Sequence, residues 1–214
     1  MVAVSGGADS LVMLHFLNEW LKKAPIKFSL VPVYLEMGFN KNHAWKRLRD
    51  HFTKMDTPFY MEETDFGKVA HSNANRGKSP CFLCSWWRRK RLFELTKVLG
   101  CKKIALGHNL DDLIETFFLN MCYSGELCTM LPRQEMFGGA VTIIRPLALV
   151  EKEKIERLAK QLRLPVGENL CPSAGISKRG EIRQMLKSIY KGNRKIRGNI
   201  AKAIFNPRPE YLPG

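Results

Sequence analysis

Residues 1–21 read MVAVSGGADSLVMLHFLNEWL, and this stretch decides the fold. Its first four residues form a short apolar run of the kind that makes a buried strand. A helical pattern follows, because leucines recur three and four residues apart at positions 11, 14, 17 and 21. Between the two lies Ser5-Gly6-Gly7-Ala8-Asp9-Ser10, a loop with adjacent glycines. The chain therefore opens with a strand, a glycine loop and a helix.

The same alternation continues along the chain. Short apolar runs predict further strands over residues 29–35, 58–61, 103–106 and 141–144. Helical spacing joins the leucines at 92, 95 and 99, and also joins Leu113, Phe117 and Met121. Because these strands are apolar throughout rather than at every second residue, they predict a parallel sheet with helices on both faces. We expect an α/β fold, a doubly wound parallel sheet of about five strands.

The pattern changes after Pro146. Helices are predicted over residues 151–162, 176–190 and 193–205, and no further strand is predicted. The sequence thus predicts an α/β domain over residues 1–148, which contains Cys81-Phe82-Leu83-Cys84. A small basic helical region over residues 149–214 follows, and it contains Cys171.

Composition and charge narrow the class of protein. The chain has 214 residues of which 45% are hydrophobic, so it can bury a core and global disorder is excluded. No uncharged apolar run approaches the roughly 18 residues of a membrane span, and residues 1–5 lack the plan of a secretory signal. We expect a cytoplasmic protein that does not bind membranes.

Positive charge predicts the partner. The 35 Lys and Arg outnumber the 20 Asp and Glu, which gives a net charge of +15. Residues 172–214 alone hold ten basic and two acidic side chains. Such a field attracts polyanions, so nucleic acid is the leading partner, with a solvated basic helix face as the alternative.

The loop between the first strand and the first helix is suited to phosphate. Its glycines let the backbone approach a ligand closely, and the helix N-terminus that follows offers free N–H groups and a positive dipole end. The loop also lies at the carboxyl end of a strand, where open α/β sheets bind ligands. It matches neither the GxxxxGKS nor the GxGxxG pattern. The alternative is an ordinary tight turn.

A second polar string, ALGHNLDDLIET, covers residues 105–116 at the end of the fourth predicted strand. Asp111 and Asp112 are adjacent carboxylates, and beside a polyphosphate they require a cation or a helix N-terminus. The alternative is one capping aspartate and one solvated neighbour. His108 is interpreted as structural.

The six cysteines are too sparse for a disulfide scaffold. Cys81 and Cys84 form a CxxC pair, which suits zinc, an iron–sulfur cluster or a redox disulfide. A zinc site of four ligands would need a second pair, and the remaining cysteines are single. Cys171 lies in a predicted accessible loop. The other cysteines lie in or beside apolar helical segments and are interpreted as small buried hydrophobes.

Trp86 and Trp87 precede a basic run. Aromatic rings beside positive charge can stack on the bases and neutralise the phosphates of single-stranded RNA. We therefore expect RNA contacts from Trp87, Arg88, Arg89 and Lys90. Phosphate contacts are expected from the basic tail residues Lys178, Arg179, Arg183, Lys187, Arg194, Lys195 and Arg197. The alternative is a pair of core tryptophans on a helix whose opposite side is basic.

These motifs resemble a known family. SGGADS resembles the SGGxDS signature of the PP-loop ATPases, or N-type ATP pyrophosphatases, and GHNLDDLIET is similar to a motif of their tRNA-modifying members. Together with the CxxC and its basic cluster, IIRPL near residues 143–147 and NLC at Cys171, they cover nearly the whole chain and resemble the tRNA 2-thiocytidine synthetase family. Many members carry Lys where this chain has Ala8, and they usually have a further segment before the loop.

The resemblance implies roles for individual residues. Ser5, Gly6, Gly7 and Ser10 would hold the pyrophosphate portion of ATP, and Asp9 would help to place Mg²⁺. The carboxylates Asp111 and Asp112 join Asp9 as the implied catalytic set. Leu35 and Gly107, at the ends of predicted strands, join the nucleotide-binding set. Cys81, Cys84 and Cys171 would hold a [4Fe-4S] cluster with one iron free of protein ligands.

The implied function is ATP-dependent tRNA thiolation, in which the C2 oxygen of a tRNA cytidine is adenylated and replaced by sulfur. The implied cofactors are ATP, Mg²⁺ and the cluster, and the partners are tRNA, a sulfur donor such as a cysteine desulfurase, and a second copy in a homodimer. Two alternatives stay open. A lysidine-synthetase-type enzyme would have no use for three cysteines, and a non-catalytic nucleotide- or RNA-binding protein would use them for a structural metal.

Overall fold

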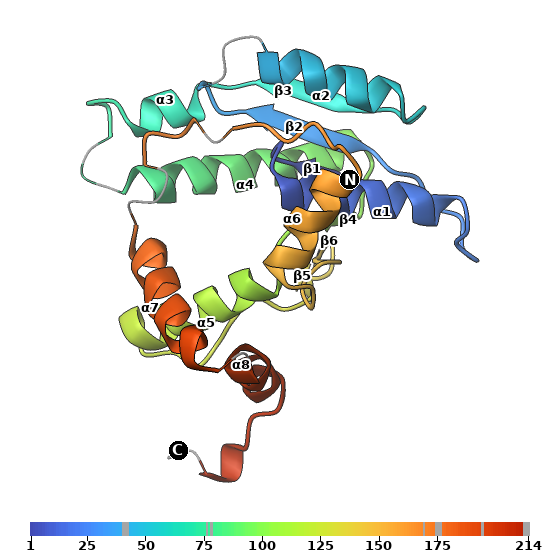
Figure 1. The fold of residues 1–214 in the computed structure, drawn as a ribbon. Coiled ribbons are helices and arrows are strands. Elements are labelled where there is room, and N and C mark those ends of the chain that lie inside the picture. Colours follow the sequence, from blue (N-terminus) through green and yellow to red (C-terminus); the bar gives the residue numbers. More distant parts are fainter. Residues whose placement is uncertain are drawn as a thin grey trace. The chain divides into compact units, whose positions relative to one another are not determined.

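The structure is a computed structural model that describes residues 1–39, 43–75, 77, 79–168, 170–173, 177–193 and 195–211. It divides into two compact units, each built from two stretches of chain. The sheet unit comprises residues 1–109 and 131–174, and the helical unit comprises residues 110–130 and 175–214. Figure 1 shows the elements of both.

The described part of the sheet unit is built on six strands in the order β3-β2-β1-β4-β6-β5. Their bounds are β1 (Val2–Val4), β2 (Pro32–Glu36), β3 (Tyr60–Glu63), β4 (Lys103–Ala105), β5 (Arg133–Met136) and β6 (Val141–Ile144). All neighbouring pairs are parallel except β5 and β6. The five predicted strands and the doubly wound parallel sheet are thereby confirmed.

Alternate residues of the central strand face two separate cores. Val2 and Val4 of β1 pack with α1 (Ala8–Leu21) and α6 (Lys152–Gln161), together with Leu48 from α2 (His43–Thr53). Ala3, between them, packs with Leu92 and other residues of α4 (Pro80–Val98) on the opposite face. Helices therefore cover both faces of the sheet, which explains why the inner strands are largely apolar rather than apolar at every second residue. A short helix, α3 (Phe66–Ala70), packs on α4.

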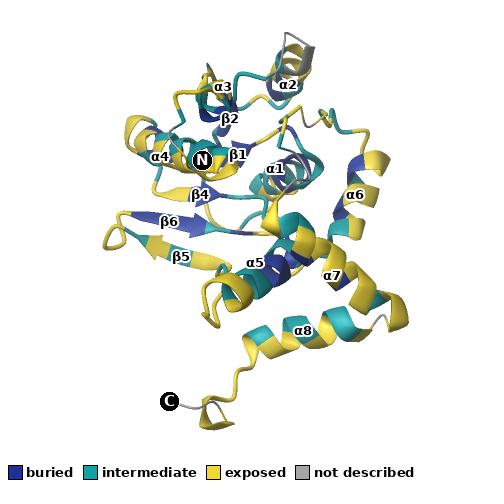
Figure 2. Ribbon diagram, turned by 90° about the vertical axis from the view of Figure 1, so that its left-hand side faces the viewer, coloured by how far each residue is buried: buried dark blue, intermediate teal, exposed yellow. Residues whose placement is uncertain are grey.

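The sixth strand, β5, was not predicted. Its sequence is RQEM, and it pairs antiparallel with β6 at the edge of the sheet. Figure 2 shows β5 largely exposed beside the buried β6. An exposed edge strand needs no apolar run, so hydrophobic periodicity does not detect it.

Within the residues that the structure describes, the helical unit has three long helices. These are α5 (Leu110–Tyr123), α7 (Lys178–Gly192) and α8 (Lys195–Phe205), followed by the single turn η1 (Pro209–Tyr211). Leu110 and Ile114 of α5 pack with Ile182 and Leu186 of α7 in a small core. As predicted, the described residues after β6 contain helices and no strand.

Candidate functional site

The glycine loop folds on itself at the end of β1. The hydroxyl of Ser10 donates to the carbonyl of Gly7 at 2.9 Å and accepts the backbone N–H of Ser5 at 3.1 Å. Gly6 has a φ of +81°, a left-handed conformation that favours glycine. Gly7 caps α1 without a side chain, so the first-turn N–H groups of that helix remain available to an anion.

Gly107 has a packing role beside this loop. A Cβ atom at Gly107 would lie 3.0 Å from the backbone nitrogen of Ser10 and 3.1 Å from the carbonyl carbon of Asp9. The backbone after β4 therefore passes directly against the first turn of α1. Only glycine allows this approach without a shift of the backbone.

The carboxylate of Asp9 is held by two residues that sequence analysis did not assign. The fully buried Asn109 donates its side-chain N–H to Oδ1 of Asp9 at 3.0 Å, and Nζ of Lys152 lies 3.5 Å from Oδ2. Asn109 belongs to the GHNLDD string, but Lys152 belongs to no motif. The sequence points to such a lysine only indirectly. The loop has Ala8 where many PP-loop proteins carry lysine, so the positive charge has to come from another residue. Lys152 brings an ammonium group to the same loop from α6.

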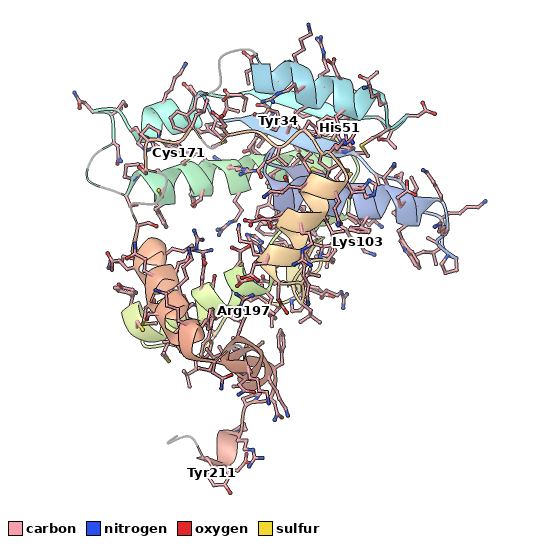
Figure 3. The ribbon with its side chains drawn as sticks, in the orientation of Figure 1. Tyr34, His51, Lys103, Cys171, Arg197 and Tyr211 are labelled. Carbon is pink, nitrogen blue, oxygen red and sulfur yellow. The ribbon has the colours of Figure 1, made fainter. Side chains whose placement is uncertain are left out.

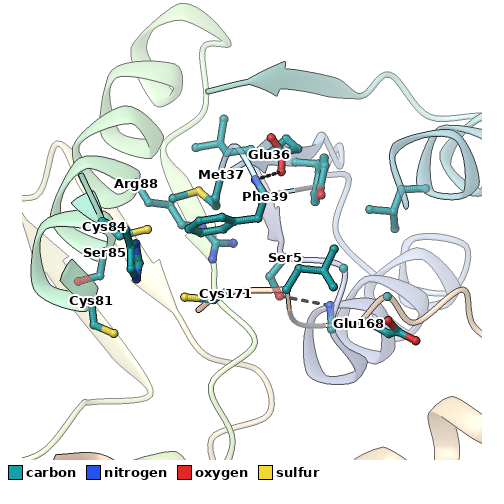
Figure 4. A pocket seen from close by; sticks show the side chains of 18 of the residues that line it. Ser5, Glu36, Met37, Phe39, Cys81, Cys84, Ser85, Arg88, Glu168 and Cys171 are labelled. Carbon is teal, nitrogen blue, oxygen red and sulfur yellow. Dashed lines mark hydrogen bonds between the residues drawn. The ribbon is translucent and has the colours of Figure 1, made fainter. Parts of the chain in front are cut away.

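A pocket of about 480 Å³ joins the loop to the cysteines. Its lining includes Ser5, Gly6, Gly7, Leu35, Arg88 and the three predicted ligand cysteines Cys81, Cys84 and Cys171. Figure 4 shows Cys81, Cys84 and Arg88 on the α4 side of this pocket, Ser5 and Glu168 on the other side, and Cys171 between them. The structure thus brings most of the predicted nucleotide and ligand residues to one space.

The end of β2 forms a further wall. Leu35 is buried and lines the pocket together with Met37 and Phe39. The carboxylate of Glu36 accepts the backbone N–H groups of Gly38 and Phe39, which turns the chain after the strand. Apart from Glu36 this wall is apolar, and it lines the same pocket as the glycine loop, which suits a planar apolar group such as adenine.

The thiol of Cys84 is affected by its surroundings. Burial raises the pKa of Cys84, and the neighbouring Cys171 and Cys81 raise it further, whereas Arg88 lowers it. Desolvation also lowers the pKa of Arg88. Arg88 was predicted to contact RNA, but its side chain faces the pocket that holds the cysteines.

Cys171 lies on a segment without helix or strand among its described residues, and it is labelled in Figure 3. This segment is tied to the glycine loop, because Gly167 donates its N–H to the carbonyl of Gly6 at 2.9 Å. A backbone hydrogen bond thus connects the glycine loop to the segment that carries Cys171.

The donor set of the pocket suits an iron–sulfur cluster. All six cysteines are free thiols, and three of them line the pocket. Such clusters are held by cysteine thiolates. Within the described ranges, no three His, Cys, Asp or Glu side chains are grouped as ligands of a single metal ion.

The aromatic and basic run on α4 divides between two environments. Trp87 is half-buried, with its ring 6.1 Å from that of Phe66, whereas Trp86 is 48% exposed and has Nζ of Lys90 5.7 Å from its ring centre. Arg89 and Lys90 are exposed. The run is therefore partly a structural contact and partly an accessible basic surface.

The acidic residues of α5 form ion pairs within the helical unit. Asp111 Oδ1 lies 3.5 Å from Nε of Arg197, and Asp112 Oδ1 lies 3.8 Å from Nη1 of Arg179. Glu115, which sequence analysis did not assign, is 4% exposed and is held by Arg183 through bonds of 2.6 and 2.9 Å.

Three predicted phosphate-binding arginines, Arg179, Arg183 and Arg197, are therefore engaged with α5. Arg197 is labelled in Figure 3. The predicted lysines Lys178, Lys187 and Lys195 are exposed. Arg194 lies outside the described residues. No described helix is long and apolar enough to cross a membrane.

Comparison with known proteins agrees with the motifs. The PP-loop domain family matches residues 1–188. The tRNA-cytidine(32) 2-sulfurtransferase of Geobacter sulfurreducens is 34% identical over 213 residues, which cover 99% of this chain and 82% of that protein. The protein of the same name from Alkalilimnicola ehrlichii is 37% identical over 216 residues, covering 99% of this chain and 68% of that protein.

Among solved structures, the U34-tRNA thiolase NcsA from Methanococcus maripaludis with its [4Fe-4S] cluster has a TM-score of 0.73. It is 22% identical, and the match covers 100% of this chain and 72% of that one. This likeness shows a shared α/β fold, and the family match over residues 1–188 assigns that fold to the PP-loop proteins. By sequence, the chain belongs to the PP-loop family and, within it, to the tRNA-cytidine(32) 2-sulfurtransferase family.

Proposed function

We propose that this chain is an ATP-dependent tRNA sulfurtransferase that replaces the C2 oxygen of a tRNA cytidine with sulfur. The observation that carries the proposal is the pocket in which the glycine loop and three thiols share one lining. Membership of the sulfurtransferase family supports it. A lysidine-type reaction would leave the three thiols without a role.

The chemistry requires activation before substitution. The C2 oxygen attacks the α-phosphate of ATP, and pyrophosphate leaves. Hydrosulfide then attacks C2, AMP departs with the former C2 oxygen, and the proton of hydrosulfide passes to solvent. The sum is redox neutral, and its products are the 2-thiocytidine, AMP and pyrophosphate.

The glycine loop would bind the phosphates that leave. The first-turn N–H groups of α1 provide donors, and Ser5 and Ser10 hold the loop in shape. Asp9 is the residue that would hold Mg²⁺, because carboxylate oxygens are the ligands that this ion prefers. Lys152, which now contacts Asp9, would then face the phosphates. Leu35 and the wall beyond it would receive adenine.

Cys81, Cys84 and Cys171 would hold a [4Fe-4S] cluster at the other end of the pocket. When bound, the cluster would supply an iron without a protein ligand, at which sulfide can be held. Arg88 faces the same space, and its positive charge partly offsets the burial that raises the pKa of Cys84.

The accessible lysines Lys178, Lys187 and Lys195, with Arg89 and Lys90, would contact the phosphates of tRNA. We also propose that a cysteine desulfurase supplies the sulfur, that the protein acts in the cytoplasm, and that it forms a homodimer. Sedimentation at several protein concentrations would measure the last of these.

The test is nucleoside analysis after reaction. Cluster-loaded protein, ATP, Mg²⁺, sulfide and unmodified tRNA should yield 2-thiocytidine, with AMP and pyrophosphate formed in equal amounts. Cys84→Ala should abolish the product, and Cys101→Ala should not, because Cys101 lies outside the pocket. Formation of lysidine when lysine replaces sulfide would refute the proposal.

A further inference from the structure

His71 connects two parts of the sheet unit. It follows the last residue of α3, and its ring makes two hydrogen bonds. Nδ1 lies 2.8 Å from the carbonyl oxygen of Gly67, and Nε2 lies 2.7 Å from the hydroxyl of Ser173. A carbonyl oxygen only accepts, so Nδ1 carries a proton; in the tautomer with this single proton, Nε2 accepts the hydrogen bond of the Ser173 hydroxyl.

The α3 side of this link belongs to the platform that carries the cysteine pair. α3 packs on α4, and the ring of Phe66 lies 6.1 Å from that of Trp87. Cys81 and Cys84 lie one turn apart near the start of α4. His71 also lines the pocket and meets the ring of Phe39 edge-on at 5.5 Å.

The Ser173 side of the link belongs to the segment that carries Cys171. Gly167 is bonded to the glycine loop, four residues before Cys171, and Ser173 is bonded to His71, two residues after it. Cys171 therefore lies between two anchors, one on the glycine loop and the other on the α3–α4 platform.

We propose that the hydrogen bond between His71 and Ser173 positions the Cys171 thiol against Cys81 and Cys84. His71 is thus a positioning residue for the three-thiol site, acting through Ser173. The inference rests on the proposed function in one respect, namely that the three thiols act together.

The first test uses the metal-free protein. The substitutions Ser173→Val and Ser173→Thr introduce side chains of the same shape, and only the threonine side chain keeps the hydroxyl. We expect alkylation of Cys171, followed by mass spectrometry, to be about fivefold faster in Ser173→Val, as the loss of one hydrogen bond predicts. Ser173→Thr should resemble the wild type. Alkylation of Cys101 in the same samples reports on general unfolding.

The histidine is tested in the same way. His71→Ala should match Ser173→Val, and His71→Gln, whose side-chain oxygen can accept at the position of Nε2, should restore most of the protection. Ser72→Ala is the matched control, because Ser72 is the exposed neighbour of His71 and its hydroxyl bonds to the backbone of Val69 and Ala74 in its own turn. Equal Cys171 rates in Ser173→Val, His71→Ala and wild type would overturn the proposal.

The second test is loss of iron to a chelator after anaerobic cluster assembly. Partners that orient metal ligands typically alter affinity about 10- to 100-fold, so iron loss should be at least about tenfold faster in Ser173→Val than in Ser173→Thr. Equal loss in both would overturn the positioning role. If the wild type binds no iron, the cluster assignment fails, and the alkylation rates still decide whether the link between His71 and Ser173 positions Cys171.

Discussion

Gly167 donates its backbone N–H to the carbonyl oxygen of Gly6 over 2.9 Å. Gly6 lies in the glycine loop that we propose binds the phosphates of ATP, and Gly167 lies four residues before Cys171. One short segment therefore spans the distance between the nucleotide end and the thiol end of the pocket. This arrangement suits a reaction in which sulfur must reach the carbon atom that bears an adenylated oxygen.

Lys152 should replace the missing loop lysine. Lys152→Ala is expected to raise the KM for ATP about tenfold, because it removes one charged contact to phosphate. Adding Ala8→Lys to this variant should restore much of the affinity. Lys154→Ala is the control, because Lys154 is exposed and pairs with Glu151. An unchanged KM in Lys152→Ala would remove this lysine from the site.

Gly107→Ala should destabilise the sheet unit. The new Cβ would lie 3.0 Å from the backbone of Ser10, and overpacking of this kind costs about 1–3 kcal/mol. Urea denaturation measures the free energy of unfolding. Gly198→Ala, where no described atom lies within 4 Å of the new Cβ, should not lower it. Equal stability of Gly107→Ala and wild type would show that the backbone can shift at no cost.

Arg183 should stabilise the helical unit. Arg183→Ala leaves the buried carboxylate of Glu115 without its two bonds, at a cost of about 2–3 kcal/mol. Hydrogen exchange along α7 and urea denaturation measure the loss. Arg133→Ala breaks an exposed pair with Glu135 and should cost less than about 1 kcal/mol. A smaller effect at Arg183 than at Arg133 would contradict this assignment.

Most of the fold could be predicted from periodicity. Strands such as β1 and β2 are buried on both faces, and their apolar runs report that burial directly. The apolar pattern did not predict β5, because Arg133 and Glu135 of this strand face solvent at the edge of the sheet. The helices of the tail were predictable from spacing, since Ile182 and Leu186 recur four residues apart on the buried side of α7.

The site was predictable where its residues are close in sequence. Ser5 to Ser10 form one loop and bond to one another. Lys152 meets Asp9 across 143 residues, through the packing of α6 on α1, and local sequence does not report such a contact. The adjacent residues Arg88 and Arg89 look alike in sequence, yet Arg88 lines the pocket and Arg89 is exposed. Helix phase decides between them.

The exposed tail lysines should govern the salt dependence of tRNA binding. In Lys178→Ala/Lys187→Ala/Lys195→Ala, the slope of log affinity against log salt should fall by about 0.7–0.9 for each lost phosphate contact. Lys22→Ala/Lys23→Ala/Lys27→Ala removes the same charge from an exposed stretch after α1 and should leave the slope unchanged. Equal slopes in the two triple variants would place tRNA elsewhere.

We propose that Cys81, Cys84 and Cys171 form one cluster site beside the glycine loop. The iron and acid-labile sulfide content of protein purified without air tests this directly. We expect about four iron and four sulfide per wild-type chain, as a [4Fe-4S] cluster contains. Both should be lost in Cys81→Ala, Cys84→Ala and Cys171→Ala and retained in Cys101→Ala, whose thiol lies outside the pocket. Absence of iron from the wild type, or iron that persists in Cys171→Ala, would contradict it.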